Sequence, residues 1–222
     1  MSAPNRLVIF DCDGTMVDTQ HIIVECMDAA FRTHKLAPPT ADQARRVVGL
    51  SLIEAVQILM PGQDITRVQE VAKTFGQNFI ANRDTDGYHE PLYPGLKEIL
   101  LHLDSAEILM GVATGKARRG LDHTLASHDI AHYFVTLQTA DRHPSKPHPS
   151  MVEAAMAEAG AEPHTTLVIG DTSYDMDMAK AAGAHAVGVN WGYHDDHELI
   201  DAGAHSVLHE FPALIPVLKE LL

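Results

Sequence analysis

The sequence predicts an α/β fold, in which a doubly wound parallel β-sheet carries a helical segment inserted after its first strand. Short, wholly apolar runs alternate with helical patterns, which is typical of strands buried between two layers of helices. Polar or glycine-containing turns follow these runs, as at strand-to-helix connections. The predicted strands are residues 7–10, 108–113, 134–137, 167–169 and 186–189. Right-handed crossovers would bring their carboxyl ends to one edge of the sheet.

The stretch between the first two predicted strands shows helical spacing and no convincing strand. Helices are predicted over residues 19–34, 41–48, 52–59 and 64–82, separated by Pro-Pro and Pro-Gly pairs. The chain then returns through the polar, hinge-like stretch 84–91. We therefore expect a sheet-bearing core formed by residues 1–17 and 84–222, and a helical cap formed by residues 18–83.

The composition excludes several classes of protein. The chain has 222 residues, of which 45% are hydrophobic and 21% charged, as is ordinary for a globular protein. Its net charge of −14 argues against sequence-independent nucleic-acid binding, which needs a basic face. Cys12 and Cys26 are the only cysteines, too few for a disulfide framework. Because no apolar run reaches membrane-spanning length and residues 1–6 lack a signal-peptide core, we expect a cytoplasmic enzyme without a membrane partner.

The most informative motif is Asp-Cys-Asp-Gly-Thr at residues 11–15, directly after the first predicted strand. Open α/β sheets place their ligands at this end of a strand, and two buried carboxylates there need a cation or different tasks. Asp11 can attack phosphorus to give an aspartyl-phosphate, while Asp13 can move a proton to and from the leaving oxygen. A capping or turn acid pair is the alternative. A calcium-binding EF-hand does not fit the spacing.

Two further motifs supply hydrogen-bond donors and positive charge. Thr114-Gly115 follows the second predicted strand, where a hydroxyl and backbone N–H groups form an anion cradle, with Lys116 adding charge. An ordinary helix cap is the alternative there. Lys146 stands between Ser145 and a proline, in a segment that prolines stiffen. Its ammonium can neutralise a nucleophilic carboxylate and a substrate phosphate together, whereas a surface lysine is the alternative.

The fourth motif, Gly-Asp-Thr-Ser-Tyr-Asp at residues 170–175, follows the fourth predicted strand. Asp171 and Asp175 are four residues apart, so they converge if a helix begins at Ser173. Hard carboxylate oxygens without thiolates favour Mg²⁺, whereas an N-capping Asp171 is the alternative. The conjunction of four motifs at one sheet edge is far more specific than any single motif.

In this order and on these loops, the four motifs resemble those of the haloacid dehalogenase superfamily, in particular its capped phosphatase branch. The resemblance covers essentially the whole chain. It implies a Rossmann-like core, a mobile cap, and Mg²⁺ held by Asp11, the backbone carbonyl of Asp13, and Asp171, with Asp175 in support. It also implies hydrolysis of a small phosphorylated metabolite through an aspartyl-phosphate intermediate, with Asp11, Asp13 and Lys146 as the catalytic residues.

The predicted cap resembles one group within that branch. Gly49-Leu50-Ser51 looks like the specificity loop of phosphoglycolate phosphatases, and residues 92–95 and 188–193 also resemble that group. Phosphoglycolate is therefore the favoured substrate, with Thr114, Gly115 and the three loop residues as its binding residues. Gly115 departs from the family pattern, because relatives commonly carry Asn before the lysine matched by Lys116. The phosphate cradle thus has one side-chain donor fewer.

Several other activities share this resemblance. Dehalogenases lack the second acid of the first motif, and phosphonate hydrolases need a cap lysine that residues 37–69 do not contain. A sugar phosphomutase, some of which use a histidine near the position of His21, and a pyrophosphatase stay open as alternatives. A non-catalytic phospho-acceptor or phospho-ligand-binding protein is the non-enzyme alternative. Receiver domains, which are phospho-acceptors, are shorter and carry no helical insertion.

Overall fold

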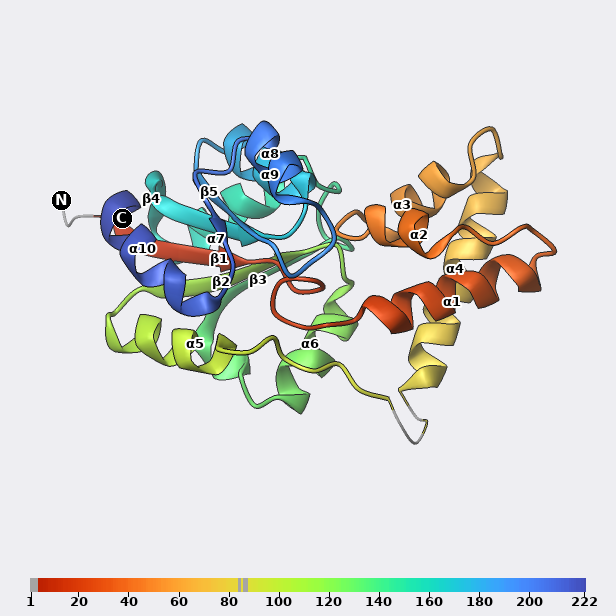
Figure 1. The fold of residues 1–222 in the computed structure, drawn as a ribbon, viewed down its shortest axis with the longest axis horizontal. Helices are drawn as coiled ribbons and strands as arrows, with labels where there is room; N and C mark the ends of the chain where they lie inside the picture. The colour runs from red at the N-terminus through yellow and green to blue at the C-terminus, as the bar shows by residue number, and fades with distance from the viewer. Residues whose placement is uncertain (1–3, 84, 86–87) are drawn as a thin grey trace.

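The computed structural model describes residues 4–83, 85 and 88–222, and its core is a parallel β-sheet (Figure 1). The strands are β1 (Asn5–Phe10), β2 (Leu109–Thr114), β3 (Phe134–Thr139), β4 (Ala161–Gly170), β5 (His185–Val189) and β6 (Val207–Leu208). Their order is β3-β2-β1-β4-β5-β6, and all five pairings are parallel. The predicted fold class and all five predicted strands are confirmed. The sixth strand was not predicted, because two residues are too short for a recognisable pattern.

Helices cover both faces of this sheet (Figure 1). The core helices are α5 (Leu96–Ser105), α6 (Arg118–Ser127), α7 (Ser150–Ala159), α8 (Ser173–Ala181), α9 (Asp196–Ala202) and α10 (Leu214–Leu221), with 3-10 turns η1 (Ala131–Tyr133) and η2 (Phe211–Ala213). In β1, Val8 and Phe10 pack with α5, α6 and α10, whereas Leu7 and Ile9 pack with α7, α8 and α9. Every residue from 7 to 10 is therefore apolar because both faces of the strand are buried.

The segment after β1 is helical, as predicted. It contains α1 (Gln20–Thr33), α2 (Ala41–Arg46), α3 (Leu52–Leu59) and α4 (Ile65–Asn82), which lie together beyond one end of the sheet (Figure 1). These helices share a hydrophobic cluster of their own, which includes Phe31, Val56 and Val71. Thr40, Ser51 and Asp64 accept backbone hydrogen bonds at the starts of α2, α3 and α4, which explains where these helices begin. Among the described residues, no helix is long and apolar enough to cross a membrane.

The chain leaves the sheet and returns to it at adjacent points. Val17 forms an isolated antiparallel bridge with Leu92, and the Asp18 backbone N–H donates to the Pro91 carbonyl at 2.9 Å. The outgoing and returning segments of the chain are thus held side by side, and they form a compact connection between the sheet and the helical segment. Part of the predicted hinge-like stretch, residues 84 and 86–87, lies outside the described residues.

Candidate active site

The site begins where β1 ends, next to the point at which the strand order changes direction. Ligands of open α/β sheets bind at such a point, between the carboxyl ends of neighbouring strands, here β1 and β4. Asp11 follows β1 and is 1% exposed, and Asp171 follows β4 and is fully buried. Gly14 has a φ of 89°, and a Cβ there would collide with the Asp171 carboxylate and the Tyr193 ring. The turn after Asp13 therefore requires glycine at this position.

Three carboxylates meet at this edge of the sheet. Asp11, Asp171 and Asp175 each offer an oxygen, and these oxygens lie within 4.8 Å of one another. Burial raises the pKa of Asp11 to about 7. The charge of Lys146 opposes this increase, and the charge of Asp175 adds to it. Burial and the two neighbouring carboxylates also raise the pKa of Asp171 well above its usual range. Buried like charges at this separation call for a cation.

The donor set fits a hard divalent cation. Both carboxylate oxygens of Asp11 are buried, and Oδ1 lies 2.8 Å from the Lys146 ammonium. Asp171 accepts from the Thr15 hydroxyl at 2.8 Å and from the Tyr193 backbone N–H at 3.0 Å, which fixes its orientation. Oxygen ligands without sulfur suit Mg²⁺, so the residues present agree with the predicted cofactor.

Lys146 lies between two of these acids. Its Nζ is 2.8 Å from Oδ1 of Asp11 and 2.6 Å from Oδ1 of Asp175, and its side chain is completely buried. Burial lowers the pKa of this ammonium, but the two carboxylates outweigh it and the pKa is raised. Asp175 Oδ2 accepts from the backbone N–H and the hydroxyl of Thr172. Both Asp175 oxygens are thus engaged, which suits a residue that orients Lys146.

Two alternatives from the sequence are excluded by this geometry. Lys146 is not a surface lysine in a proline-rich turn. Asp171 is not a helix cap, because Thr172 is the N-cap of α8 and forms a capping box with Asp175. The predicted convergence of Asp171 and Asp175 at a helix starting at Ser173 is confirmed.

Replacing Lys146 with Met is expected to destabilise the metal-free protein by about 3–5 kcal/mol, because it leaves two buried carboxylates without their cation. Urea unfolding in the presence of a chelator measures this change. Lys180→Met serves as the control, because Lys180 is an exposed lysine on α8. Equal unfolding midpoints for the two variants would contradict the central position of Lys146.

The carboxylate of Asp13 belongs to a second, separate cluster. Its Oδ1 accepts from Lys116 Nζ at 2.6 Å and from the Thr19 hydroxyl at 2.9 Å. Lys116 Nζ also lies 3.8 Å from Oε1 of Glu90. Burial lowers the pKa of Lys116, but the charges of Asp13 and Glu90 outweigh it and raise the pKa. The two acids of the first motif therefore have different surroundings, as two different tasks require.

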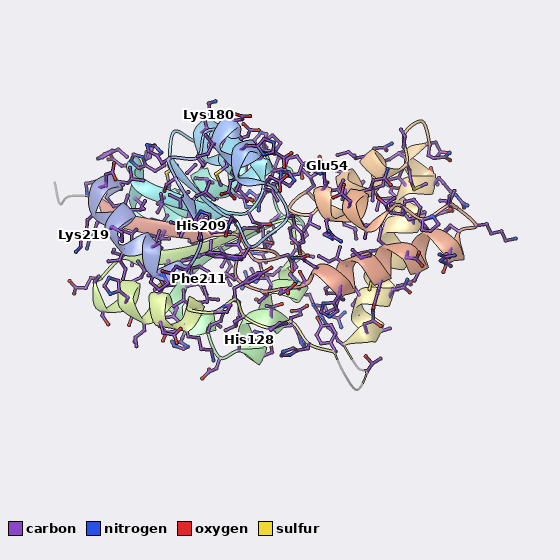
Figure 2. All side chains as sticks on the ribbon, viewed as in Figure 1. Glu54, His128, Lys180, His209, Phe211 and Lys219 are labelled. Atoms are coloured by element: carbon purple, nitrogen blue, oxygen red, sulfur yellow. The ribbon has the colours of Figure 1, made fainter. Side chains whose placement is uncertain are left out.

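Glu90 is the functional candidate that sequence reasoning missed. It is 5% exposed, and Oε2 accepts from the Thr124 hydroxyl at 2.8 Å, while Tyr88 OH donates to Oε1. His128, labelled in Figure 2 after α6, has Nε2 2.7 Å from the Glu90 carbonyl oxygen. Burial raises the pKa of Glu90, but Lys116 and the hydroxyl donors outweigh it and hold the pKa below its usual range. In the sequence, Glu90 is one acid in a polar stretch and belongs to no motif. Of this cluster, the motifs identified only Asp13 and Lys116.

Thr114 and Gly115 follow β2, as predicted, but Thr114 does not cap the next helix. The Thr114 hydroxyl accepts from the Lys116 backbone N–H at 3.1 Å, and α6 begins only at Arg118. A Cβ on Gly115 would lie 2.6 Å from the Gly49 carbonyl oxygen and would also collide with the carbonyl of Leu50. Gly115 is thus the residue that lets the helical segment approach the sheet edge. This is a physical reason for its departure from the family pattern.

The predicted specificity loop, residues 49–51, lies against the core. The Ser51 backbone N–H donates to the Ser145 hydroxyl at 2.8 Å, next to Lys146. On the same side, Arg46 at the end of α2 pairs with Glu198 of α9 at 2.5 Å. The structure therefore brings Gly49, Leu50 and Ser51 close to the loops that carry the core motifs.

Replacing Gly115 with Ala is expected to lower kcat/KM about tenfold, mainly through KM, because the added methyl group forces residues 49–50 away from the sheet edge. Steady-state kinetics and limited proteolysis of the 47–51 loop measure the two consequences. Gln77→Ala is the control, since Gln77 is exposed on α4. Kinetics and proteolysis identical to those of the control would show that this close approach is unnecessary.

The loop after β5 covers the carboxylates. A Cβ on Gly192 would collide with the side chain of Asp171, and Trp191 Nε1 donates to the Thr15 carbonyl at 3.1 Å. Trp191 is held in turn by the ring of Phe211, whose centroid lies 4.8 Å away and which Figure 2 labels. Thr15 and Tyr193 lie in segments that the sequence analysis singled out, but their contacts with Asp171 were not predicted. The Thr15 hydroxyl and the Tyr193 backbone N–H hold Asp171 in place.

Fold and site together define a doubly wound α/β enzyme whose centre combines a buried carboxylate paired with a lysine and a cluster of three carboxylates suited to a cation. The model of the haloacid dehalogenase-like hydrolases matches residues 8–189, and the chain belongs to that family. The resemblance seen in the motifs is thereby confirmed.

Full-length relatives agree with this assignment. The chain is 35% identical to the protein named Probable phosphatase IndB of Dickeya dadantii, covering 97% of this chain and 94% of that protein. It is 30% identical to the phosphoglycolate phosphatase of Photobacterium profundum, covering 96% of each. A hydrolase from Pseudomonas syringae superposes with a TM-score of 0.85 at 25% identity, over 98% of this chain and 99% of that one. The predicted class of enzyme, a haloacid dehalogenase-like phosphatase, is confirmed.

Proposed function

We propose that this phosphatase is a Mg²⁺-dependent phosphomonoester hydrolase that works through an aspartyl-phosphate intermediate on Asp11. The observation that carries the proposal is the position of Asp11, which is buried at the carboxyl end of β1 and lies 2.8 Å from Lys146. An ionised carboxylate can attack phosphorus as a nucleophile. The charge of Lys146 favours the ionised form of Asp11 against the effect of burial.

The other residues take the remaining tasks. Asp13 protonates the leaving oxygen and later takes a proton from the attacking water, and Lys116 and Thr19 hold its carboxylate for both steps. The hydroxyl of Thr114 and the backbone N–H of Gly115 bind oxygens of the transferring phosphoryl group. Lys146 balances the charge of Asp11 and the substrate phosphate.

The proposed metal ligands are Asp11, the backbone carbonyl of Asp13, and Asp171, with Asp175 acting indirectly because its oxygens bind Lys146 and Thr172. When bound, Mg²⁺ offsets negative charge on the carboxylates and on the phosphoryl oxygens. The carboxylate cluster supports this assignment.

Residues 18–83 are proposed to act as a cap on the core formed by residues 1–17 and 84–222. The hydrogen bond from the Ser51 backbone N–H to the Ser145 hydroxyl and the Arg46–Glu198 pair support a closed arrangement over the site. Closure excludes bulk water while the phosphoryl group is transferred, and the cap must open again for product release.

Phosphoglycolate is the first substrate to test, because the specificity loop resembles that of phosphoglycolate phosphatases and a full-length relative carries that name. The test is a phosphate-release assay across phosphoglycolate, sugar phosphates, nucleotides and pyrophosphate, with Mg²⁺ and with a chelator. Release that persists at the same rate after exhaustive chelation would contradict the proposal.

The same assay separates the alternatives. Isomerisation of a sugar phosphate without phosphate release would indicate a mutase. His21, the residue considered for that reaction, is exposed and is not among the described residues that line the cavity beside Asp13. Release from pyrophosphate alone would indicate a pyrophosphatase. Stoichiometric phosphorylation without turnover would indicate a phospho-acceptor.

A further inference from the structure

Resting on the proposed phosphatase activity, we propose that the alcohol portion of the substrate is bulky and largely apolar, such as an alcohol bearing an aromatic ring. The helical segment and the site line a partly open cavity of about 540 Å³, which is in the size range of sites for drug-sized ligands, about 300–1,000 Å³. A two-carbon acid would leave most of this space to water. The proposal therefore concerns the part of the substrate that fills the rest of the cavity.

The cavity joins the proton-transfer residue to an apolar wall. Asp13, Gly115 and Lys116 line its end at the sheet edge. The helical segment contributes what we call the apolar wall, which consists of Ile23, Met27, Val48, Ile53, Phe79 and Ile80. A phosphoryl group bound at the sheet edge would thus direct its alcohol portion toward hydrocarbon side chains.

The inward face of helix α4 continues from the hydrophobic cluster of the helical segment into this cavity. Val68, Val71 and Ala72 are buried in the cluster that holds the helical segment together. Positions 76, 79, 80 and 83 follow the spacing of one helix face, and all four line the cavity. The last turns of α4 therefore present Phe79 and Ile80 to the cavity, which indicates a binding surface.

Two members of the apolar wall are exposed although they are large. Ile53 is 43% exposed and Ile80 is 41% exposed, and they come from α3 and α4. Covering apolar surface gains about 25 cal/mol per Å², so such a surface within a concave site favours an apolar occupant. A carboxylate placed against these side chains would lose its hydration without a donor in return.

The place where the alcohol oxygen would lie adjoins an aromatic ring. Lys116 Nζ, which pairs with Asp13 at 2.6 Å, is also 5.3 Å from the centroid of the Phe79 ring. The ring is therefore next to the group that holds the proton donor. Carbon atoms adjacent to the ester oxygen would lie within reach of Phe79, where an aromatic or aliphatic group packs favourably.

Charged groups also face the cavity and define the competing interpretation. Arg83, Arg119 and Asp141 are among its lining residues, and the Arg83 guanidinium lies 5.4 Å from the centroid of the Phe79 ring. An arginine could bind the carboxylate of phosphoglycolate, whereas a guanidinium over an aromatic ring also suits stacking on a flat ligand. The experiment must therefore compare an acidic and an aromatic alcohol directly.

The comparison uses phosphoglycolate and 3-phenylpropyl phosphate, because both are esters of unactivated primary alcohols. For the wild type we expect kcat/KM to be at least about tenfold higher for the phenylpropyl ester, equivalent to about 1.4 kcal/mol. Gly76→Leu is expected to remove this preference by raising KM for the phenylpropyl ester at least about tenfold. Gly76 lines the cavity, a Cβ there meets no atom within 4 Å, and leucine favours helix, so the variant should fold.

Gln77→Leu is the matched control, because it adds the same side chain at the exposed neighbouring position of α4. It is expected to keep the wild-type preference. A second readout does not need turnover: 3-phenylpropylphosphonate should bind the wild-type enzyme with Mg²⁺, and Gly76→Leu should weaken this binding in calorimetry.

The outcomes distinguish this inference from the proposed function. Hydrolysis of phosphoglycolate in preference to the phenylpropyl ester, unchanged by Gly76→Leu, would overturn the inference and leave the phosphatase proposal standing. Phosphonate binding that Gly76→Leu weakens, with no ester hydrolysed at all, would support the apolar wall as a binding surface and overturn the phosphatase proposal.

Discussion

Replacing Asp11 with Asn is expected to reduce kcat by at least ~10⁴-fold while the fold stays intact. The amide has the same shape as the carboxylate but cannot form the covalent bond to phosphorus. Asp175 has its oxygens bound by Lys146 and Thr172, and Asp171 is held by Thr15 and Tyr193, so neither can replace Asp11 as the nucleophile. The remaining residues would still bind substrate, so KM should change far less than kcat.

Single-turnover phosphate release and acid-quench trapping of labelled protein measure this effect. Wild-type enzyme should carry acid-stable label during turnover, and Asp11→Asn should carry none. Asp104→Asn is the control, since Asp104 is exposed on α5, and it should behave as wild type. Retention of more than about one hundredth of the wild-type kcat in Asp11→Asn would contradict a nucleophilic role.

The same variant has an expected effect on stability that depends on pH. Burial raises the pKa of Asp11 from 3.8 to about 7 in the folded, metal-free protein. As the pH rises from 3.8 to 7, the unfolded chain releases this proton before the folded one does, so the wild type loses stability relative to Asp11→Asn. The difference should be small at pH 4 and largest at pH 7 and above, as urea unfolding with a chelator can measure. A difference that does not grow with pH would contradict this charge penalty.

Mg²⁺ is expected to raise the melting temperature of the wild type, and Asp171→Asn is expected to lose most of that rise together with activity. Three buried carboxylates repel one another without a cation, and a cation that binds only the folded chain stabilises it by mass action. At a Mg²⁺ concentration of 100 times Kd the gain is about 2.7 kcal/mol, which corresponds to about 5–11 °C for a chain of this size.

Thermal unfolding with a Mg²⁺ titration, alongside phosphate release, tests this prediction. Asp177→Asn is the matched control, because Asp177 lies on the exposed side of α8. It should keep both the full temperature shift and the activity. A shift of equal size in Asp171→Asn would place the cation elsewhere.

The strands and the four motifs could be predicted because their signals are local. Residues 7–10 are apolar because both sheet faces are covered, and Asp11 follows them directly in the chain. Parallel strands connected by right-handed crossovers then place the following loops at one edge. For this reason the meeting of Asp11, Lys146 and Asp171 followed from order and spacing alone.

Contacts that depend on side-chain direction across the fold could not be predicted. Glu90 gave no signal, because its role depends on Lys116 reaching it from another loop. Gly115 first suggested a weaker phosphate cradle, whereas the structure gives a steric reason for it in the carbonyl of Gly49. Both contacts connect residues far apart in sequence, and no periodic pattern records them.

The sequence by itself determined the fold class, the family and which motif residues lie at the sheet edge, because apolar runs and motif spacing are properties of neighbouring residues. The tertiary structure alone decided how the two acids of the first motif are separated, Asp11 beside Lys146 and Asp13 beside Lys116. It also decided the shape and lining of the cavity next to Asp13. The physical reason is that burial, electrostatic pairing and enclosed volume arise only when distant segments pack together.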